Sequence, residues 1–239
     1  MRYNAGELIT AMITPFNDDL SIDYKSFEKL IEHLIKTGSD SILVAGTTGE
    51  TPTLTHEEEA EMFDFIKKTV NGRIKLIMGA GSNCTETAVK SSKNAQKAGA
   101  DAILTVVPYY NKPSQKGMYE HFSAIAKAVD LPIILYNIPG RTGVNMKPET
   151  IAKLAHEFKN IVAVKQSNAD LDLISEIKMQ TPDDFTIYSG DDSLTLPMMS
   201  LGANGVIRVA SHIAGKEVKN MITLFKEGKN NEALDLHLQ

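Results

Sequence analysis

The sequence lacks several features that would point to particular classes of protein. A single cysteine, Cys84, excludes an internal disulfide and fits a reducing compartment. No segment approaches the roughly 20 uninterrupted apolar residues that a membrane-spanning helix needs. The amino terminus has only a short apolar run with no small-residue cleavage site, so no signal peptide is expected. We therefore expect a cytoplasmic protein without a membrane anchor.

The sequence also lacks a large excess of either positive or negative charge. The 239 residues carry a formal net charge of −5, and 42% of them are hydrophobic, with no low-complexity tract. A mildly acidic chain does not suit nucleic acid or an anionic membrane as its main partner. The composition instead indicates a globular protein that acts on small molecules.

Short β-branched and apolar runs recur along the chain, separated by segments with helical periodicity. The first helical segment places Phe27, Leu30, Ile31, Leu34 and Ile35 on one face. Such alternation predicts parallel strands joined by helices, and closure into a (β/α)8 TIM barrel is the simplest architecture. The eight expected strands lie within residues 8–16, 41–49, 74–81, 102–110, 132–140, 161–168, 185–192 and 204–212.

An open doubly wound sheet is the alternative fold. It is disfavoured because no G-x-G-x-x-G motif follows the first strand. Helix-start signals agree with the alternation, since Thr55 with Glu58 predicts a capping box and Pro148 a first helical turn. We expect the barrel to occupy residues 1–228 and residues 229–239 to begin a shortened carboxyl-terminal helical segment.

Active sites of such barrels lie at the carboxyl ends of the strands. Lys165 ends the apolar run "IVAV", where an ammonium group is costly to bury. Taken alone, Lys165 would be read as a solvent-exposed residue after the strand. A buried lysine amine, however, can form a Schiff base with a carbonyl substrate. Lowering its pKa from about 10.4 to about 7.5 takes about 4 kcal/mol, which burial and a nearby guanidinium such as Arg141 can supply.

Other strand ends add hydroxyl and phenol groups that suit proton transfer. Tyr136, Tyr110 and a threonine of "GTTGE" are candidates for a relay. A metal is not expected, because the six histidines lack ligand spacing, and no other cofactor is indicated. The aspartates of "SGDD" fit either a helix N-cap or a Mg²⁺ ligand pair.

These motifs, in this order, resemble the dihydrodipicolinate synthase family of class I aldolase-type barrels. The resemblance rests on "GTTGE", "PYYNKPSQ", "LYNIPGRTG", "VAVK", "SGDD" and "GVI", and it runs from about residue 5 to the end. It implies a lyase that condenses pyruvate with aspartate semialdehyde in lysine biosynthesis. It also implies a homotetramer built from tight dimers.

The resemblance assigns roles to individual residues. Lys165 would form the Schiff base, with Tyr136 as general acid/base and Thr47 and Tyr110 completing the relay. Tyr110 would reach into the neighbouring subunit's site. The substrates would be bound by Thr48 at the pyruvate carboxylate, Arg141 at the aldehyde's carboxylate, and Gly190 and Ile207 through backbone groups.

The chain differs from the family pattern at three places. Gln166 replaces an acidic residue, which is expected to alter the electrostatics beside the amine, and Arg208 replaces a serine, which adds a cation near the rim. The family continues into further carboxyl-terminal helices, which we expect to be largely missing here. Two alternatives stay open: a pyruvate-releasing sugar-acid aldolase, of the N-acetylneuraminate or keto-deoxy-gluconate type, and a truncated or engineered barrel with little activity.

Overall fold

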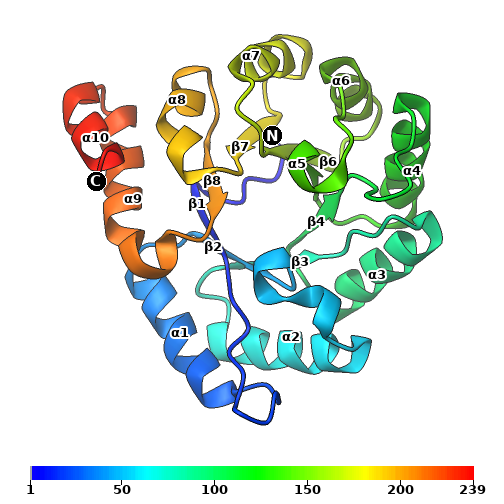
Figure 1. Ribbon diagram of the computed structural model, residues 1–239, viewed down its shortest axis with the longest axis vertical. Helices are drawn as coiled ribbons and strands as arrows, with labels where there is room; N and C mark the ends of the chain where they lie inside the picture. Colours follow the sequence, from blue (N-terminus) through cyan, green and yellow to red (C-terminus); the bar gives the residue numbers. More distant parts are fainter. Residues whose placement is uncertain (1) are drawn as a thin grey trace.

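The computed structural model describes residues 2–239 and forms a closed barrel of eight parallel strands (Figure 1). The strands follow one another around the barrel in chain order, and β8 pairs with β1 to close it. The predicted (β/α)8 barrel is therefore confirmed. The strands are β1 Leu8–Ala11, β2 Ser41–Val44, β3 Lys75–Gly79, β4 Ala102–Val106, β5 Ile133–Asn137, β6 Ile161–Gln166, β7 Thr186–Ser189 and β8 Gly205–Arg208.

Helices surround the barrel, and each expected strand is followed by helical structure. Three short 3₁₀ segments, η1 Thr47–Gly49, η2 Thr51–Thr53 and η3 Asp192–Leu194, lie after β2 and β7. The α-helices are α1 Tyr24–Lys36, α2 His56–Val70, α3 Thr85–Ala98, α4 Gln115–Ala128, α5 Pro139–Thr142, α6 Pro148–Glu157, α7 Leu171–Gln180, α8 Thr195–Ser200, α9 Ser211–Lys226 and α10 Asn230–His237. None of the helices within residues 2–239 is long and apolar enough to span a membrane.

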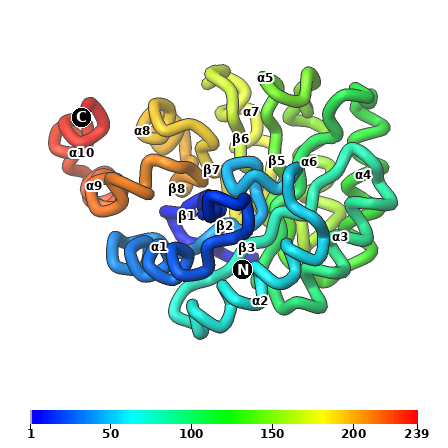
Figure 2. The backbone as a smooth tube through the Cα atoms, turned by 60° about the horizontal axis from the view of Figure 1, so that its bottom comes forward, coloured from blue at the N-terminus to red at the C-terminus, as the bar shows by residue number. Residues whose placement is uncertain are grey.

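The helix signals in the sequence are confirmed. Thr55 caps α2, and its side chain and that of Glu58 satisfy each other's backbone N–H groups in a capping box. Pro148 occupies the first turn of α6. Figure 2 shows α10 lying against α9 at the edge of the molecule, so residues after the barrel do begin another helix. The proposed division of the chain at residue 228 stays a prediction.

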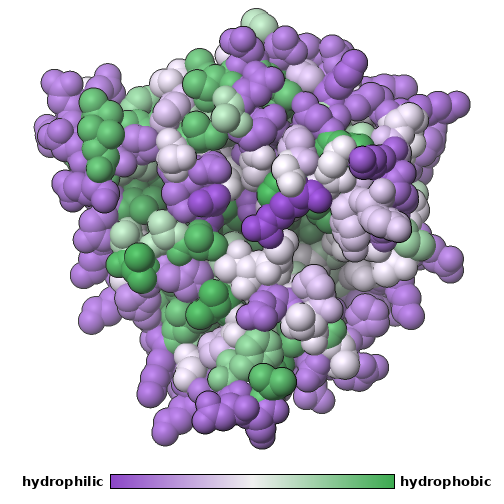
Figure 3. Space-filling model, in the orientation of Figure 1, coloured by the Kyte–Doolittle hydropathy of each residue, from purple (hydrophilic) through white to green (hydrophobic). Residues whose placement is uncertain are grey.

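Two apolar layers hold the barrel together. The inner layer fills its interior with side chains such as Ile9, Leu43, Ile77 and Ile134, while the outer layer packs the strands against the helices. Burial on both sides explains the nearly continuous apolar strand sequences. On the face seen in Figure 3, hydrophilic residues form much of the periphery and less hydrophilic ones gather toward the middle.

Asp40 ties the amino-terminal end of the barrel together. Its carboxylate accepts hydrogen bonds from the backbone N–H groups of Glu7 (2.8 Å) and Leu8 (2.9 Å), and from the Lys219 ammonium of α9 (2.7 Å). Burial alone would raise the pKa of Asp40, but the Leu8 N–H and Lys219 more than offset this and lower it. The carboxylate thus joins the start of β1 to α9.

We expect Asp40→Ala to lower the free energy of unfolding by about 2 kcal/mol, because two backbone N–H groups lose their acceptor and the Lys219 ammonium keeps only Glu7 as a partner. Glu32→Ala is the control: it removes an exposed ion pair with Arg73 and should change the free energy of unfolding much less than Asp40→Ala does. Since the folded-state pKa of Asp40 is lowered, its contribution is present above the unfolded value of 3.8 and is lost as the pH falls further. Urea titrations at pH 7 check this, and equal costs for the two variants would contradict it.

Candidate active site

A β-bulge in β6 directs Lys165 into the barrel. Ile133 of β5 pairs with Ile161, but the next residue, Ile134, pairs with Ala163, so Val162 is the extra residue. Val162 and Ala163 both belong to the inner layer, whereas Ile161 and Val164 pack outward. Strict alternation from Ile161 would place Lys165 on the outer face; the bulge instead turns it inward.

The side chain of Lys165 is buried, with 6% of its surface exposed. Reading it as a solvent-exposed residue beyond the strand is therefore wrong. It contributes to a pocket of about 180 Å³ at the carboxyl end of the barrel. The pocket is lined by Ala11, Leu43, Thr47, Thr48, Leu104, Tyr136, Ile138, Arg141, Lys165, Gly190, Ile207, Arg208 and Val209.

The pocket makes the Lys165 amine less basic. Burial, followed by the charges of Arg208 and then Arg141, lowers its pKa to about 7, while Asp192 acts in the opposite direction. The expected effects of burial and of Arg141 are both present. Arg208, which the sequence analysis predicts to add a cation near the rim, lowers this pKa more than Arg141 does. A substantial fraction of the amine is thus unprotonated near neutral pH and able to act as a nucleophile.

Tyr136 lies beside Lys165 on the neighbouring strand. The two residues are paired across β5 and β6, and the Lys165 Nζ atom is 4.2 Å from the centre of the Tyr136 ring. Burial raises the pKa of the Tyr136 phenol, and Ser167 and the two arginines offset this only in part. Tyr136 therefore carries its proton at neutral pH, next to the nucleophile.

Hydroxyl and guanidinium groups complete the pocket. Thr47 and Thr48 begin η1, which starts after Ala45 and Gly46 at the end of β2, and both line the pocket. Arg141 lies in α5 after β5. Within residues 2–239 the side chains of these three residues have no hydrogen-bond or ion-pair partner, so their polar groups are free to meet a ligand.

Gly190 and Ile207 also line the pocket, as the sequence predicts. A side chain at Gly190 would not fit, because its Cβ would lie 1.7 Å from the Ser167 Oγ atom and 3.1 Å from the Lys165 Cε atom. Glycine therefore lets the backbone pass this close to Ser167 and to the lysine. Ile138 and Val209 line the pocket as well and were not foreseen from sequence, although each follows a strand end directly.

Tyr110 does not reach the pocket of its own chain. Its side chain is 88% exposed, and its backbone is in the left-handed region, with φ of 70°. Tyr109 instead lines an adjacent hollow of about 230 Å³ that shares Thr47 and Tyr136 with the pocket. A role for Tyr110 in a neighbouring subunit stays a prediction.

Gln166 lies on the opposite face of β6 from Lys165. Its Oε1 atom accepts a hydrogen bond from Asn137 (3.1 Å), and Asn137 also bonds to Asn145 and Met146. The residue is fully buried in this amide cluster, behind the connection that carries Arg141. Its direct contact is thus with β5 and, through Asn137, with the β5–α6 connection. The expected effect of Gln166 on the electrostatics beside the amine stays a prediction.

One of the aspartates of "SGDD" stands at a helix N-cap position, and the other pairs with an arginine. Asp191 precedes η3 without a side-chain capping bond, and Asp192 pairs with Arg208 at 2.6 Å. In the part of the chain that the structure describes, no three or more His, Cys, Asp or Glu residues are grouped to hold a metal ion. Both aspartates thus lie beside the Arg208 guanidinium, Asp192 at 2.6 Å and Asp191 at 3.9 Å.

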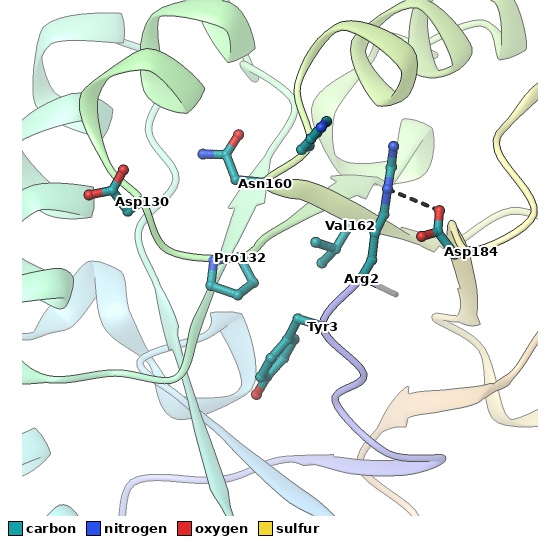
Figure 4. A pocket seen from close by; sticks show the side chains of 8 residues that line it. Arg2, Tyr3, Asp130, Pro132, Asn160, Val162 and Asp184 are labelled. Atoms are coloured by element: carbon teal, nitrogen blue, oxygen red, sulfur yellow. Dashed lines mark ion pairs between the residues drawn. The ribbon is translucent and has the colours of Figure 1, made fainter.

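A larger hollow of about 550 Å³ lies at the amino-terminal end of the barrel (Figure 4). Arg2 crosses it and is held by Asp184 (3.2 Å) and by the backbone oxygens of Ala155 and Ile161. Asn160 donates to the backbone oxygens of α4 and of the turn after it. Arg2 thus joins the amino-terminal segment to the barrel, and Asn160 joins the start of β6 to α4. Because both groups already have protein partners, this hollow is not the candidate active site.

Comparisons with known proteins agree with this geometry. A model of the Dihydrodipicolinate synthetase family matches residues 4–239. The chain is 50% identical over 234 residues to the 4-hydroxy-tetrahydrodipicolinate synthase of Bacillus subtilis, covering 98% of this chain and 81% of that protein. It is 53% identical over 235 residues to that of Microcystis aeruginosa, covering 98% and 79%.

Solved structures give the same result. The dihydrodipicolinate synthase of Bacillus anthracis superposes with a TM-score of 0.96 at 45% identity, covering 100% of this chain and 81% of that one. The enzyme of Cyanidioschyzon merolae, solved with lysine bound, gives a TM-score of 0.95 at 51% identity, covering 98% and 80%. The chain belongs to the dihydrodipicolinate synthetase family.

Proposed function

We propose that the pocket around Lys165 condenses pyruvate with L-aspartate 4-semialdehyde to give 4-hydroxy-tetrahydrodipicolinate, a step of lysine and diaminopimelate biosynthesis. The observation that carries this proposal is a buried lysine whose pKa is lowered to about 7 within a pocket at the carboxyl end of the barrel. The relatives at about 50% identity bear the name of this synthase. The reaction class is therefore that of a Schiff-base lyase acting on small molecules.

The first stage activates pyruvate. The unprotonated Lys165 amine attacks the ketone carbon, and loss of water gives an imine whose positive nitrogen withdraws electrons. A proton then leaves the pyruvate methyl group, which produces an enamine. The centre of the Tyr136 ring lies 4.2 Å from the amine and Thr47 lines the same pocket, which supports Tyr136 as the group that donates and accepts these protons and Thr47 as part of the relay.

The second stage forms the carbon–carbon bond. The enamine carbon attacks the aldehyde of the semialdehyde, and the resulting alkoxide takes a proton to become the hydroxyl group. The amino group of the same substrate then attacks the imine carbon, closes the ring and releases Lys165. No redox step occurs, and the only small molecule lost is the water released on imine formation.

Two carboxylates must be held while these bonds form. The free Thr48 hydroxyl suits the pyruvate carboxylate, and the unpaired Arg141 guanidinium suits the carboxylate of the semialdehyde through a bidentate pair. Gly190 and Ile207 shape the wall between them. This assignment explains why uncommitted polar groups border a lysine that is otherwise in apolar surroundings.

The proposal extends to assembly and location. Tyr110 is 88% exposed on a connection with strained backbone, a geometry suited to a residue that acts in a neighbouring subunit's site. We therefore propose a homo-oligomer, a dimer or tetramer, in which Tyr110 completes the partner's proton relay. The single free cysteine fits a cytoplasmic location.

Reduction with borohydride tests the mechanism directly. We expect treatment with pyruvate and borohydride to add a pyruvyl-sized mass to Lys165, as located by peptide mass spectrometry, because reduction fixes the imine. Product formation from the semialdehyde should exceed cleavage of sialic acid or keto-deoxy-gluconate by at least about 100-fold, since transition-state contacts set specificity. An unmodified Lys165 would overturn the mechanism, and faster cleavage of a sugar acid would overturn the substrate assignment.

A further inference from the structure

Arg208 connects the end of β8 to the segment that follows β7. Its Nε and Nη2 atoms donate to the Asp192 Oδ2 atom at 2.9 and 2.6 Å, and its Nη1 atom donates to the Gly190 backbone oxygen at 2.6 Å. The side chain is 26% exposed and lines the same pocket as Lys165. All of its nitrogen atoms are thus engaged, in contrast to those of Arg141.

The segment that Arg208 holds lies against the nucleophile. A Cβ atom at Gly190 would be 3.1 Å from the Lys165 Cε atom, and the Gly190 N–H donates to the Gln166 backbone oxygen at 2.8 Å. Gly190 is therefore fixed on one side by β6 and on the other by the Arg208 guanidinium. Loss of the guanidinium would release one of these two restraints.

We propose that Arg208, oriented by Asp192, is a positioning residue for the Lys165 nucleophile: it fixes the Gly190 wall against the lysine and maintains a positive charge beside the amine. This proposal rests on the proposed function. It goes beyond that function because it makes Arg208 a working part of this pocket, although the family pattern has a serine there.

The charges around Lys165 predict in which direction each substitution shifts the titration of its amine. A positive neighbour disfavours the ammonium form and a carboxylate favours it, and the effects of Arg208 and Asp192 have these opposite signs. The Tyr188 phenol on β7 points away and donates to the Gly6 oxygen. The groups that face the Lys165 amine or the Arg208 guanidinium beside it come from four elements and the residue before one of them: Arg208 on β8, Arg141 on α5, Tyr136 on β5, Asp192 on η3 and Asp191 before η3. Asp191 lies 3.9 Å from Arg208.

The test compares Arg208→Ser, Arg208→Lys and Asp192→Asn with the unaltered chain. The rate of borohydride-trapped imine formation with pyruvate is measured from pH 5 to about 10, and its midpoint reports the Lys165 titration. We expect Arg208→Ser to raise the midpoint by about 0.5 to 1 unit and Asp192→Asn to lower it by about 0.5 unit. Arg208→Lys should hold the midpoint within about 0.3 unit but lower the maximal rate, because lysine keeps the charge but lacks the fork that holds both Gly190 and Asp192.

Opposite shifts support the proposal, since loss of structure alone would not move the midpoint in two directions. Unchanged midpoints in variants that trap pyruvate would overturn it and leave the proposed function intact. Failure of the unaltered chain to trap pyruvate would overturn the proposed function itself. If Arg208→Ser does not fold, as judged by thermal unfolding, Asp192→Asn must still lower the midpoint, or the proposal is wrong.

Discussion

Replacing Lys165 with methionine is expected to lower synthase turnover by at least about 1,000-fold, because no other group in the pocket can form the imine. Methionine has a similar length and fills the same space without the amine. The measurement is product formation from pyruvate and aspartate semialdehyde, together with the mass of the borohydride-treated protein. We expect no pyruvyl adduct in this variant.

Lys159→Met is the matched control. Lys159 lies at the opposite end of the same strand region, is exposed, and lines only the amino-terminal hollow. Its replacement should change turnover by no more than about twofold, as surface substitutions far from a site usually do. Substantial turnover in Lys165→Met, or equal losses in the two variants, would contradict the assignment of the nucleophile.

The Lys165→Met variant should also be more stable than the unaltered chain near neutral pH. The folded-state pKa of Lys165 is lowered from 10.5 to about 7, so the unfolded state binds the proton more strongly between these values. Stability therefore rises with pH across this window, and the cost at pH 7 is up to about 4 kcal/mol. Lys165→Met removes that cost, so urea unfolding should show a gain at pH 7 that disappears above pH 10.5. A variant less stable than the unaltered chain at pH 7 would contradict this expectation.

The barrel itself could be predicted from the sequence. Its strands are buried on both sides, so their apolar runs are continuous and easily separated from helices with a single apolar stripe. In a closed parallel barrel, the last residues of all strands lie at one end. Thr47, Tyr136, Arg141 and Lys165 could therefore be assigned to one pocket although they are far apart in the sequence.

The finer geometry could not be predicted, because it depends on pairing between distant segments. The bulge at Val162 reverses which side of β6 Lys165 occupies, and nothing in "NIVAVKQ" distinguishes a bulged from a regular strand. The same shift places Gln166 behind the strand. The contact between Arg208 and Asp192 likewise depends on how β8 and the segment after β7 meet, so the sequence indicated a cation but not its partner.

Replacing Tyr136 with phenylalanine is expected to lower turnover by about 100- to 1,000-fold, the usual contribution of a positioned general acid/base. The ring and its packing remain, and only the proton-carrying hydroxyl is removed. Pyruvate should still label Lys165 fully after long borohydride treatment, but more slowly, because the lysine is intact while proton transfer is impaired. Progress curves of trapping and of product formation measure the two effects separately.

Tyr188→Phe is a close control for this change. Tyr136 and Tyr188 are paired with Lys165 on its two sides, and both rings belong to the inner layer of the barrel. The Tyr188 hydroxyl, however, points to the amino-terminal end and donates to the Gly6 oxygen at 2.9 Å. Its loss should cost about 1 kcal/mol of stability and change turnover by less than about threefold. Equal losses of turnover in the two variants would mean that packing beside Lys165, and not the Tyr136 proton, limits the reaction.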